Sequence, residues 1–238
     1  MTRRVIIGHS HCTAIAQALR DWDVPGHQIS VHQLNARDGV DIAISGSDAV
    51  QLVAVLPPDA RIFLVVLGGY HNLLGLLRSG EPFDVLVDAS DAVDPLATTL
   101  IPHRALTGAF DDQFEGIEKI DALIDAAPCP VILLSSPPPK RDNEFVLERF
   151  MAQKSREYRG RSVEDYGVER PEARLKLWRL EAGIMAKWAE SRGVQFLAAP
   201  EAASDSEGYL RKDCYAEDVT HANATYGRLV LEQVSSHP

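Results

Sequence analysis

The chain has 238 residues, 45% of them hydrophobic and 24% charged, which is enough apolar material for one sizeable globular domain. Its formal net charge is −10, and no block of lysine and arginine offsets it, so neither nucleic acid nor an anionic membrane surface is expected as a partner. No apolar run approaches a membrane span or the core of a secretory signal, so we expect a cytoplasmic protein that is not exported. Cys12, Cys129 and Cys214 are odd in number and widely spaced, which predicts reduced thiols rather than disulfides or a zinc knuckle.

The first predicted unit is a strand, a turn and a helix. The apolar residues 5–7 end at Gly8, Ser10 follows in the turn, and residues 13–21 have the apolar spacing of a helix. A serine between a buried strand and a helix can serve as a nucleophile, although such a serine is more commonly a helix N-cap. Ser10 is therefore a candidate nucleophile with a structural alternative.

Further strands are predicted by apolar runs that glycine, proline and serine interrupt. They cover residues 29–34, 41–44, 61–67, 130–134 and 194–197, with helices up to residue 56 and over residues 115–126 and 171–192. The uninterrupted apolar run 62–67 is typical of a strand buried on both faces of a parallel sheet. Strands that alternate with helices predict an α/β fold with a doubly wound parallel sheet, and we expect a single domain over residues 1–238.

Two segments do not follow this alternation. Residues 142–170 are polar and rich in charge, with Arg156, Arg159 and Arg161 close together, and we interpret this segment as a lid or flap. The stretch 83–112 is dense in aspartate and is predicted to be irregular surface.

The residues with useful chemistry follow the predicted strands. In open α/β sheets, ligands bind beyond the carboxyl ends of the strands, and Ser10, Gly46 and Gly69 follow such ends. Far along the chain, Asp218 and His221 form an Asp-x-x-His pattern, which can supply a general base and the carboxylate that orients it. The pattern predicts a serine hydrolase with Ser10, His221 and Asp218 as its catalytic triad.

Four short blocks, in their order along the chain, resemble the SGNH or GDSL hydrolases, a flavodoxin-like superfamily of esterases and lipases. The blocks are GHS at residues 8–10, ISGSD at 44–48, GGYHN at 68–72 and DVTH at 218–221. The resemblance covers nearly the whole chain and implies a three-layer α/β/α fold around a central parallel sheet. It also implies acyl transfer, in which His221 takes the proton of Ser10 while Asp218 holds the imidazole.

The same resemblance implies an oxyanion hole. The backbone amides of Ser10 and Gly46 are expected to bind the oxyanion, together with a side-chain donor from Asn72 or His71. The third block of the family has asparagine where this chain has Tyr70. Because the loss of one oxyanion donor costs about a hundred- to a thousandfold in turnover, this substitution predicts a weak or specialised activity.

Two further features bear on the family and the substrate. His9 replaces the aspartate of the first block, and a bacterial branch of SGNH-like proteins, of largely unassigned substrate, shares the segments 136–139 and 174–178 with this chain. The expected substrate is an O-acetyl or other short acyl ester on a carbohydrate, because the acidic chain has no obvious lipid-binding face and the arginine-rich segment 142–170 can meet a polar or anionic glycan. No cofactor or metal is expected, and the oligomeric state is left open.

Two other classes of function stay open at this point. One is a catalytically weakened SGNH-fold protein that binds a glycan or acts as a scaffold, for which Tyr70 is the main support. The other is a metal-dependent hydrolase that uses His9 and His11, with further histidines at 71, 103 and 221, although the chain is short for eight strand–helix pairs. A nucleotide site is not predicted, because no Gly-x-Gly-x-x-Gly follows the first strand.

Overall fold

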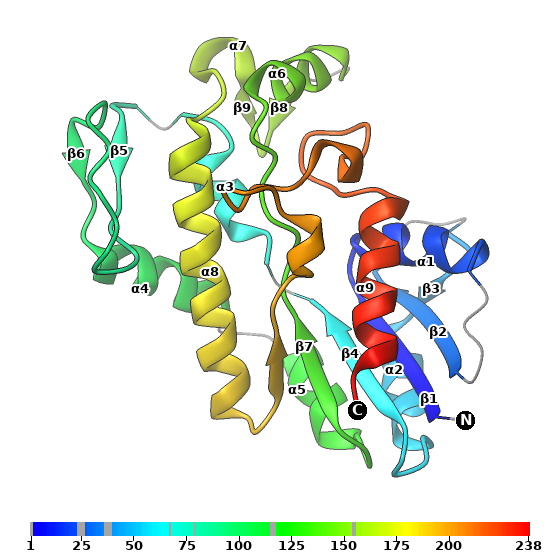
Figure 1. The fold of residues 1–238 in the computed structure, drawn as a ribbon. Helices are drawn as coiled ribbons and strands as arrows, with labels where there is room; N and C mark the ends of the chain where they lie inside the picture. The colour runs from blue at the N-terminus through cyan, green and yellow to red at the C-terminus, as the bar shows by residue number, and fades with distance from the viewer. Residues whose placement is uncertain are drawn as a thin grey trace.

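A six-stranded parallel sheet forms the centre of the fold (Figure 1). In the computed structural model, which describes residues 2–22, 27–35, 40–66, 68–78, 80–114, 118–153 and 156–238, the strand order is β10-β7-β4-β1-β2-β3. All neighbouring pairs are parallel, as the alternation of strands and helices predicts. The strands are β1 (Thr2–Gly8), β2 (His27–Leu34), β3 (Ala43–Ile44), β4 (Arg61–Val65), β7 (Val131–Leu134) and β10 (Gln195–Leu197).

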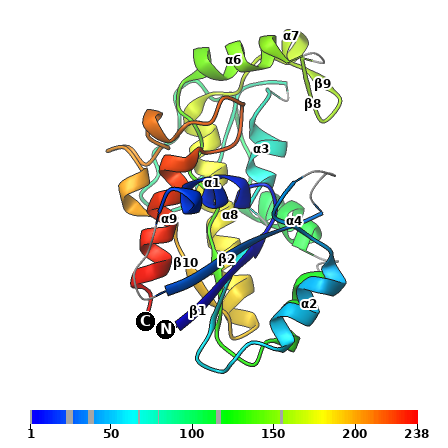
Figure 2. The ribbon, with the colours of Figure 1, turned by 90° about the vertical axis from the view of Figure 1, so that its right-hand side faces the viewer.

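Helices cover both faces of the sheet, as the side view in Figure 2 shows. No helix in the described ranges is both long enough and apolar enough to cross a membrane. The helices are α1 (Cys12–Arg20), α2 (Gly46–Ala54), α3 (Tyr70–Gly75), α4 (His103–Phe114), α5 (Glu118–Ala126), α6 (Asn143–Ala152), α7 (Val163–Tyr166), α8 (Pro171–Ser191) and α9 (Ala224–Ser236), with short 3-10 turns at η1 (Glu201–Ala203) and η2 (Lys212–Cys214).

The hydrophobic core lies in two layers, one on each face of the sheet. Ile62 and Leu64 of β4 belong to the core that contains α2, α5 and α8. The alternate residues Phe63 and Val65 belong to the core that contains α1 and α9. Because successive side chains of a strand point to opposite faces, a strand buried on both faces must be apolar throughout, as β4 is. The predicted three-layer α/β/α fold is therefore confirmed.

Most predicted elements differ from the observed ones only at their ends. The first helix begins one residue earlier than predicted, and α8 ends one residue before the predicted limit. The predicted strand at residues 41–44 is reduced to the two residues of β3. Residue 67 of the predicted fourth strand and residues 115–117 of the predicted helix 115–126 lie outside the described residues.

The prediction of irregular surface over residues 83–112 is wrong in two respects. Its second part forms most of α4, which buries Leu106 and Phe110 on one side. Its first part contains the small parallel pair of β5 (Phe83–Asp84) and β6 (Thr99–Leu100). The carboxylate of Asp84 is buried there and accepts two hydrogen bonds from Lys176 Nζ of α8, at 2.9 and 2.8 Å. Asp84, Asp88 and Asp91 of this stretch therefore form ion pairs with Lys176 and Arg179 of α8.

The segment predicted as a lid or flap lies beyond the carboxyl edge of the sheet, where Figure 1 shows α6 and α7. It also contains the antiparallel pair β8 (Glu157–Tyr158) and β9 (Arg161–Ser162). A small hydrophobic cluster joins it to the body of the protein through Leu76, Leu77, Val146, Phe150, Val163, Val168 and Val219. Val219 belongs to the Asp-x-x-His block, so this segment packs directly against that block. Its movement as a lid stays a prediction.

Candidate active site

Ser10 lies in the tight turn between β1 and α1. The strand continues one residue beyond Gly8 through a hydrogen bond from His9 N to Val65 O at 2.9 Å. A Cβ atom at Gly8 would come within 2.1 Å of that same carbonyl oxygen, so only glycine allows β1 and β4 to approach this closely. The chain then turns, and Thr13 N donates to Ser10 O at 3.1 Å. Ser10 is thereby placed, exposed, at the carboxyl edge of the sheet.

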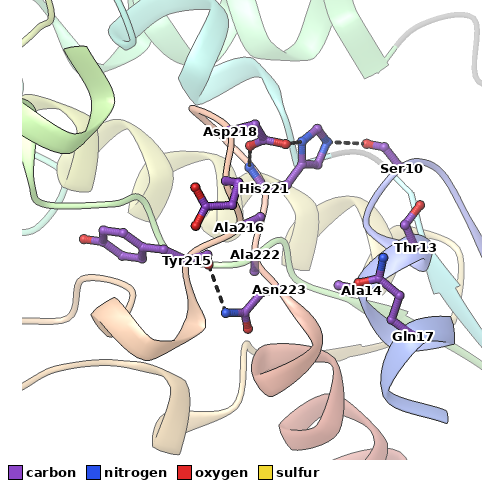
Figure 3. Close-up of a pocket in the computed structure, with 11 residues that line it drawn as sticks. Ser10, Thr13, Ala14, Gln17, Tyr215, Ala216, Asp218, His221, Ala222 and Asn223 are labelled. Atoms are coloured by element: carbon purple, nitrogen blue, oxygen red, sulfur yellow. Dashed lines mark hydrogen bonds and ion pairs between the residues drawn. The ribbon is translucent and has the colours of Figure 1, made fainter. Parts of the chain in front are cut away.

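The alternative role of Ser10, as a helix cap, is not the one observed. The N-cap residue of α1 is His11, and its side chain makes no capping hydrogen bond. The hydroxyl of Ser10 instead lies 2.8 Å from Nε2 of His221, a residue 211 positions away (Figure 3). The turn therefore presents Ser10 to the C-terminal block rather than to its own helix.

Asp218 and His221 form a compact loop immediately before α9. One carboxylate oxygen of Asp218 accepts hydrogen bonds from the backbone N–H groups of Thr220, at 2.9 Å, and His221, at 2.7 Å. The other oxygen lies 2.7 Å from Nδ1 of His221 (Figure 3). With Nδ1–H donated to Asp218, Nε2 is left as the acceptor for the Ser10 hydroxyl. The three side chains thus form one continuous chain of hydrogen bonds.

The environment keeps Asp218 ionised. Burial by itself raises the pKa of this carboxyl group, but the hydrogen bonds from the side chain and backbone of His221 and from Thr220 outweigh burial and hold the pKa well below its usual range. A carboxylate that stays negative can stabilise a positive charge on the adjacent imidazole. Asp218 therefore meets the electrostatic requirement for the third member of a triad.

The packing of α1 on α9 sets the distance between Ser10 and His221. A Cβ atom at Gly227 would lie 2.2 Å from the backbone oxygen of Ala14, so the two helices cross at nearly direct backbone contact. Asn223 caps α9 by accepting hydrogen bonds from Thr225 N and Tyr226 N, at 2.8 and 3.4 Å. The cap fixes the first turn of α9 directly after the His221 loop.

His11 packs against His221. The two rings are 5.3 Å apart between centroids, in an edge-on arrangement. Burial, together with the neighbouring charge of His221 and other histidines, lowers the pKa of His11 to about 3. His11 is therefore neutral at neutral pH and adds no positive charge next to His221.

The residues predicted to complete the oxyanion hole with Ser10 lie on two different helices, Gly46 on α2 and His71 and Asn72 on α3. Gly46 is the first residue of α2, capped by the Ser45 hydroxyl, which accepts from Asp48 N at 3.1 Å. His71 is buried in α3, with Nδ1 2.6 Å from Oε2 of Glu181. None of Gly46, His71 and Asn72 is among the described residues that line the cavity beside Ser10. Their role as oxyanion donors stays a prediction.

A cavity of about 590 Å³ opens beside Ser10 and His221. It lies between one side of α1 and the loop that carries Asp218 and His221 (Figure 3). Its polar lining includes Thr13 and Gln17 of α1, and Glu217 and Asn223 from the C-terminal side. The candidate nucleophile and base therefore lie next to a recess with both polar and apolar lining.

A metal centre at the first turn is not supported. Within the described ranges, no group of three or more histidine, cysteine, aspartate or glutamate residues is arranged to hold a metal ion. His71 instead contacts Glu181, and His103 lies at the start of α4, where its ring is 3.2 Å from the Thr107 hydroxyl.

Two buried charged residues near the site were not predicted. Glu181 of α8 accepts the hydrogen bond from Tyr70 N at 2.8 Å in addition to its contact with His71. Lys140 donates to the backbone of the Asp218 loop. Their signals in the sequence are weak, because a charged residue in a polar segment is normally solvated.

The chain matches no protein-family model and no curated protein. Solved structures do match, at low identity, over nearly the whole chain. The extracellular lipase of Streptomyces rimosus is 15% identical, with a TM-score of 0.48, 99% of this chain covered and 98% of that one. The phospholipase A1 of Streptomyces albidoflavus is 13% identical (TM-score 0.48, 98% of both chains), and a GDSL-like lipase of Bacteroides thetaiotaomicron is 15% identical (TM-score 0.44, 98% and 88%).

The names of these proteins include the class that the sequence blocks resemble.

Proposed function

We propose that this protein is a serine hydrolase that cleaves an ester bond by acyl transfer. The observation that carries the proposal is the chain of hydrogen bonds from Ser10 through His221 to Asp218, with distances of 2.8 and 2.7 Å. A serine hydroxyl, an imidazole and an ionised carboxylate in this order are the arrangement that activates serine as a nucleophile.

The proposed reaction has two halves. In the first, His221 Nε2 takes the proton of the Ser10 hydroxyl as Oγ bonds to the ester carbonyl carbon, and His221 then gives that proton to the departing alcohol. In the second, His221 takes a proton from water, the water oxygen attacks the acyl-serine, and the acid leaves as Ser10 regains its proton. Asp218 stabilises the cationic imidazole in both halves. Backbone amides of Ser10 and Gly46, with His71 or Asn72, are the proposed oxyanion donors.

We further propose a short acyl ester of a carbohydrate, such as an O-acetyl sugar, as the substrate. The cavity beside Ser10 supports this choice, because about 590 Å³ accommodates a sugar-sized alcohol. The hydroxyl group of Thr13 and the amide group of Gln17 line that cavity and can exchange hydrogen bonds with sugar hydroxyls. A long acyl chain would instead require an apolar recess.

The test is hydrolysis of an activated aryl acetate by the wild-type protein and by Ser10→Ala, with and without a chelator. We expect Ser10→Ala to lower kcat by about 10³- to 10⁶-fold, since the nucleophile is removed while the rest of the site stays in place. The chelator should have no effect on the wild-type rate. Equal rates for the two proteins would contradict the proposal.

A second candidate function is glycan binding without turnover. The contact of His71 with Glu181 inside the protein favours this alternative, because it engages one of the two proposed side-chain donors. Calorimetry with acetylated and deacetylated sugars separates the two functions. If the protein only binds glycans, the wild-type protein with Ser10 intact will bind the acetylated sugar without hydrolysing it.

A further inference from the structure

We propose that Lys140 is a positioning residue that holds the loop of Asp218 in the geometry required for contact with His221. This inference rests on the proposed function, because it assigns Lys140 a part in the same triad. Lys140 lies in the segment that follows β7, outside the four sequence blocks that carry the family resemblance.

The contacts of the ammonium group define the role. Lys140 Nζ donates a hydrogen bond to the backbone oxygen of Asp218 at 2.5 Å and a second to that of Ala216 at 2.8 Å. It also lies 4.0 Å from Oδ1 of Asp218, and its side chain is only 2% exposed. The same ammonium group lies over the rings of Phe145 and Tyr215, at 4.9 and 5.2 Å from their centroids. One buried cation therefore fixes both ends of the short run 216–218.

The charges around Lys140 come from two parts of the chain, the loop of Asp218 and helix α6. Burial lowers the pKa of Lys140 to about 8, while the carboxylates of Asp218 and Glu217 act to raise it and the guanidinium of Arg149 on α6 acts to lower it. At neutral pH the side chain of Lys140 is therefore protonated in most molecules. A buried lysine is stable only when its charge and its donors are satisfied, so Lys140 constrains the atoms that satisfy it.

Lys140 is itself held in place from α8. The buried guanidinium of Arg174 donates to the backbone oxygens of Lys140 and Arg141, at 2.7 and 3.3 Å, and to Asn143 Oδ1 at 2.7 Å. These bonds hold the backbone of Lys140 from α8 as well as from the C-terminal stretch, where Arg141 N donates to the Tyr215 hydroxyl at 2.9 Å. The contact of the ammonium group is thus a brace between the segment after β7 and the loop of Asp218.

The segment that leads into Lys140 is also bound to α8. Trp178, at the end of the segment 174–178, donates from Nε1 to the backbone oxygen of Ser136 at 3.2 Å, and Arg174, at its start, binds Lys140 and Arg141. The segment 136–139 leads directly into Lys140. One turn of α8 therefore anchors the chain that delivers the ammonium to the Asp218 loop.

The consequence for catalysis follows from the backbone of the loop. With its carbonyl oxygen bound to Lys140, Asp218 keeps its side chain directed to Thr220 N, His221 N and His221 Nδ1. Without the ammonium, the oxygens of Ala216 and Asp218 lose a donor and the loop gains freedom to turn. A misplacement of about 1 Å in a catalytic group can cost about a hundredfold in rate.

The experiment compares Lys140→Met with Lys212→Met in hydrolysis of the aryl acetate. Methionine keeps the unbranched apolar stem and removes the donors, while Lys212 is a matched control because it is exposed and pairs with Asp142. We expect Lys140→Met to lower kcat by about 10- to 100-fold with KM within about twofold, and Lys212→Met to equal the wild type. A folded Lys140→Met with wild-type kcat would overturn the inference.

Hydrogen exchange provides a readout that does not depend on turnover. The amides of Thr220 and His221, which donate to Asp218, should exchange faster in Lys140→Met than in Lys212→Met. If Lys140→Met does not fold, Lys140→Gln takes its place, because glutamine retains an N–H donor. Lys140→Gln should lower kcat by less than the about 10- to 100-fold expected for Lys140→Met, and the amides of Thr220 and His221 should still exchange faster than in Lys212→Met. Unchanged exchange at these amides would overturn the inference.

Ser10→Ala in the same assay distinguishes a failure of the proposed hydrolase activity from a failure of the role proposed for Lys140. If Ser10→Ala is as active as the wild type, the proposed hydrolase fails, and hydrogen exchange alone decides whether Lys140 holds the loop. If Ser10→Ala is inactive while Lys140→Met keeps full kcat and unchanged exchange, the hydrolase stands and only the role of Lys140 fails.

Discussion

At the scale of single residues, the site is built from charges that are each matched by a neighbour. Asp218 is ionised because His221 and two backbone amides compensate for its burial, and Lys140 binds the opposite side of the same loop. His11, in contrast, is held neutral beside His221. In the proposed reaction, Asp218 is the carboxylate that stabilises the protonated imidazole formed when His221 takes the proton of Ser10.

The low pKa of His11 predicts a dependence of stability on pH. Unfolded His11 binds a proton below about pH 6.5, but folded His11 does so only near pH 3, so the free energy of unfolding falls as the pH is lowered through this window. The contribution is at most about 1.4 kcal/mol per pH unit. His11→Asn should therefore lose less stability than the wild type between pH 7 and pH 5 in urea unfolding.

The matched control for this measurement is His103→Asn, since His103 is exposed at the start of α4. Its loss of stability between the two pH values should equal that of the wild type. If His11→Asn and the wild type lose the same stability over this interval, the burial of His11 does not oppose its protonation and the prediction fails.

At the scale of elements, the crossing of α1 and α9 is the feature that brings Ser10 and His221 together. Gly227 permits that crossing, since any larger residue would meet the backbone of Ala14 and Ile15. The strand end at Gly8 makes a second close approach, to Val65 of β4. Two glycines therefore set the positions of Ser10 and of His221, one through a strand and one through a helix.

Gly227→Ala should separate α1 from α9. The added Cβ atom would lie 2.2 Å from a backbone oxygen, and overpacking of this kind typically costs about 1–3 kcal/mol. We expect both a lower melting temperature and a lower kcat, because the distance between Ser10 and His221 changes with the helices. Thermal unfolding and kcat for the aryl acetate measure the two effects.

Gly183→Ala is the control for this substitution, because Gly183 lies inside α8 and an added Cβ atom there meets nothing within 4 Å. It should be neutral or slightly stabilising, since alanine favours a helix by about 1 kcal/mol over glycine. A Gly227→Ala protein as stable and as active as Gly183→Ala would show that the helix crossing does not fix the site.

Patterns that are local in sequence predict the elements of this fold well. The apolar run of β4 and the proline at the start of α8 are such patterns. In α4, the many aspartates nearby conceal the i, i+4 pair of Leu106 and Phe110. Local pattern was therefore sufficient for the sheet and insufficient for this peripheral helix.

At the site, the proximity of Ser10, Asp218 and His221 can be predicted because these residues belong to recognisable blocks. Lys140 and Glu181 cannot, because their importance depends on partners 78 and 110 positions away. Single-sequence patterns do not report such contacts, since burial of a charged residue is decided by the packing of distant elements. The predicted oxyanion donor His71 shows the same limit, because its contact with Glu181 is visible only in the folded chain.

At the scale of the whole molecule, three separate regions meet at the carboxyl edge of one sheet. The turn after β1 carries Ser10, the loop before α9 carries Asp218 and His221, and the segment after β7 carries Lys140. Sites in open α/β sheets form at this edge because loops and helix ends converge there. The central claim about this molecule is that the convergence makes Ser10 a reactive nucleophile.

The measurement that tests this claim most directly is covalent labelling of Ser10 by an active-site-directed aryl phosphonate, followed by intact-mass and peptide analysis. We predict one adduct per chain, located on the peptide that contains Ser10, and at least about a hundredfold slower labelling of His221→Ala, because the general base is then missing. An unlabelled wild-type protein, or labelling at the same rate in His221→Ala, would contradict the account.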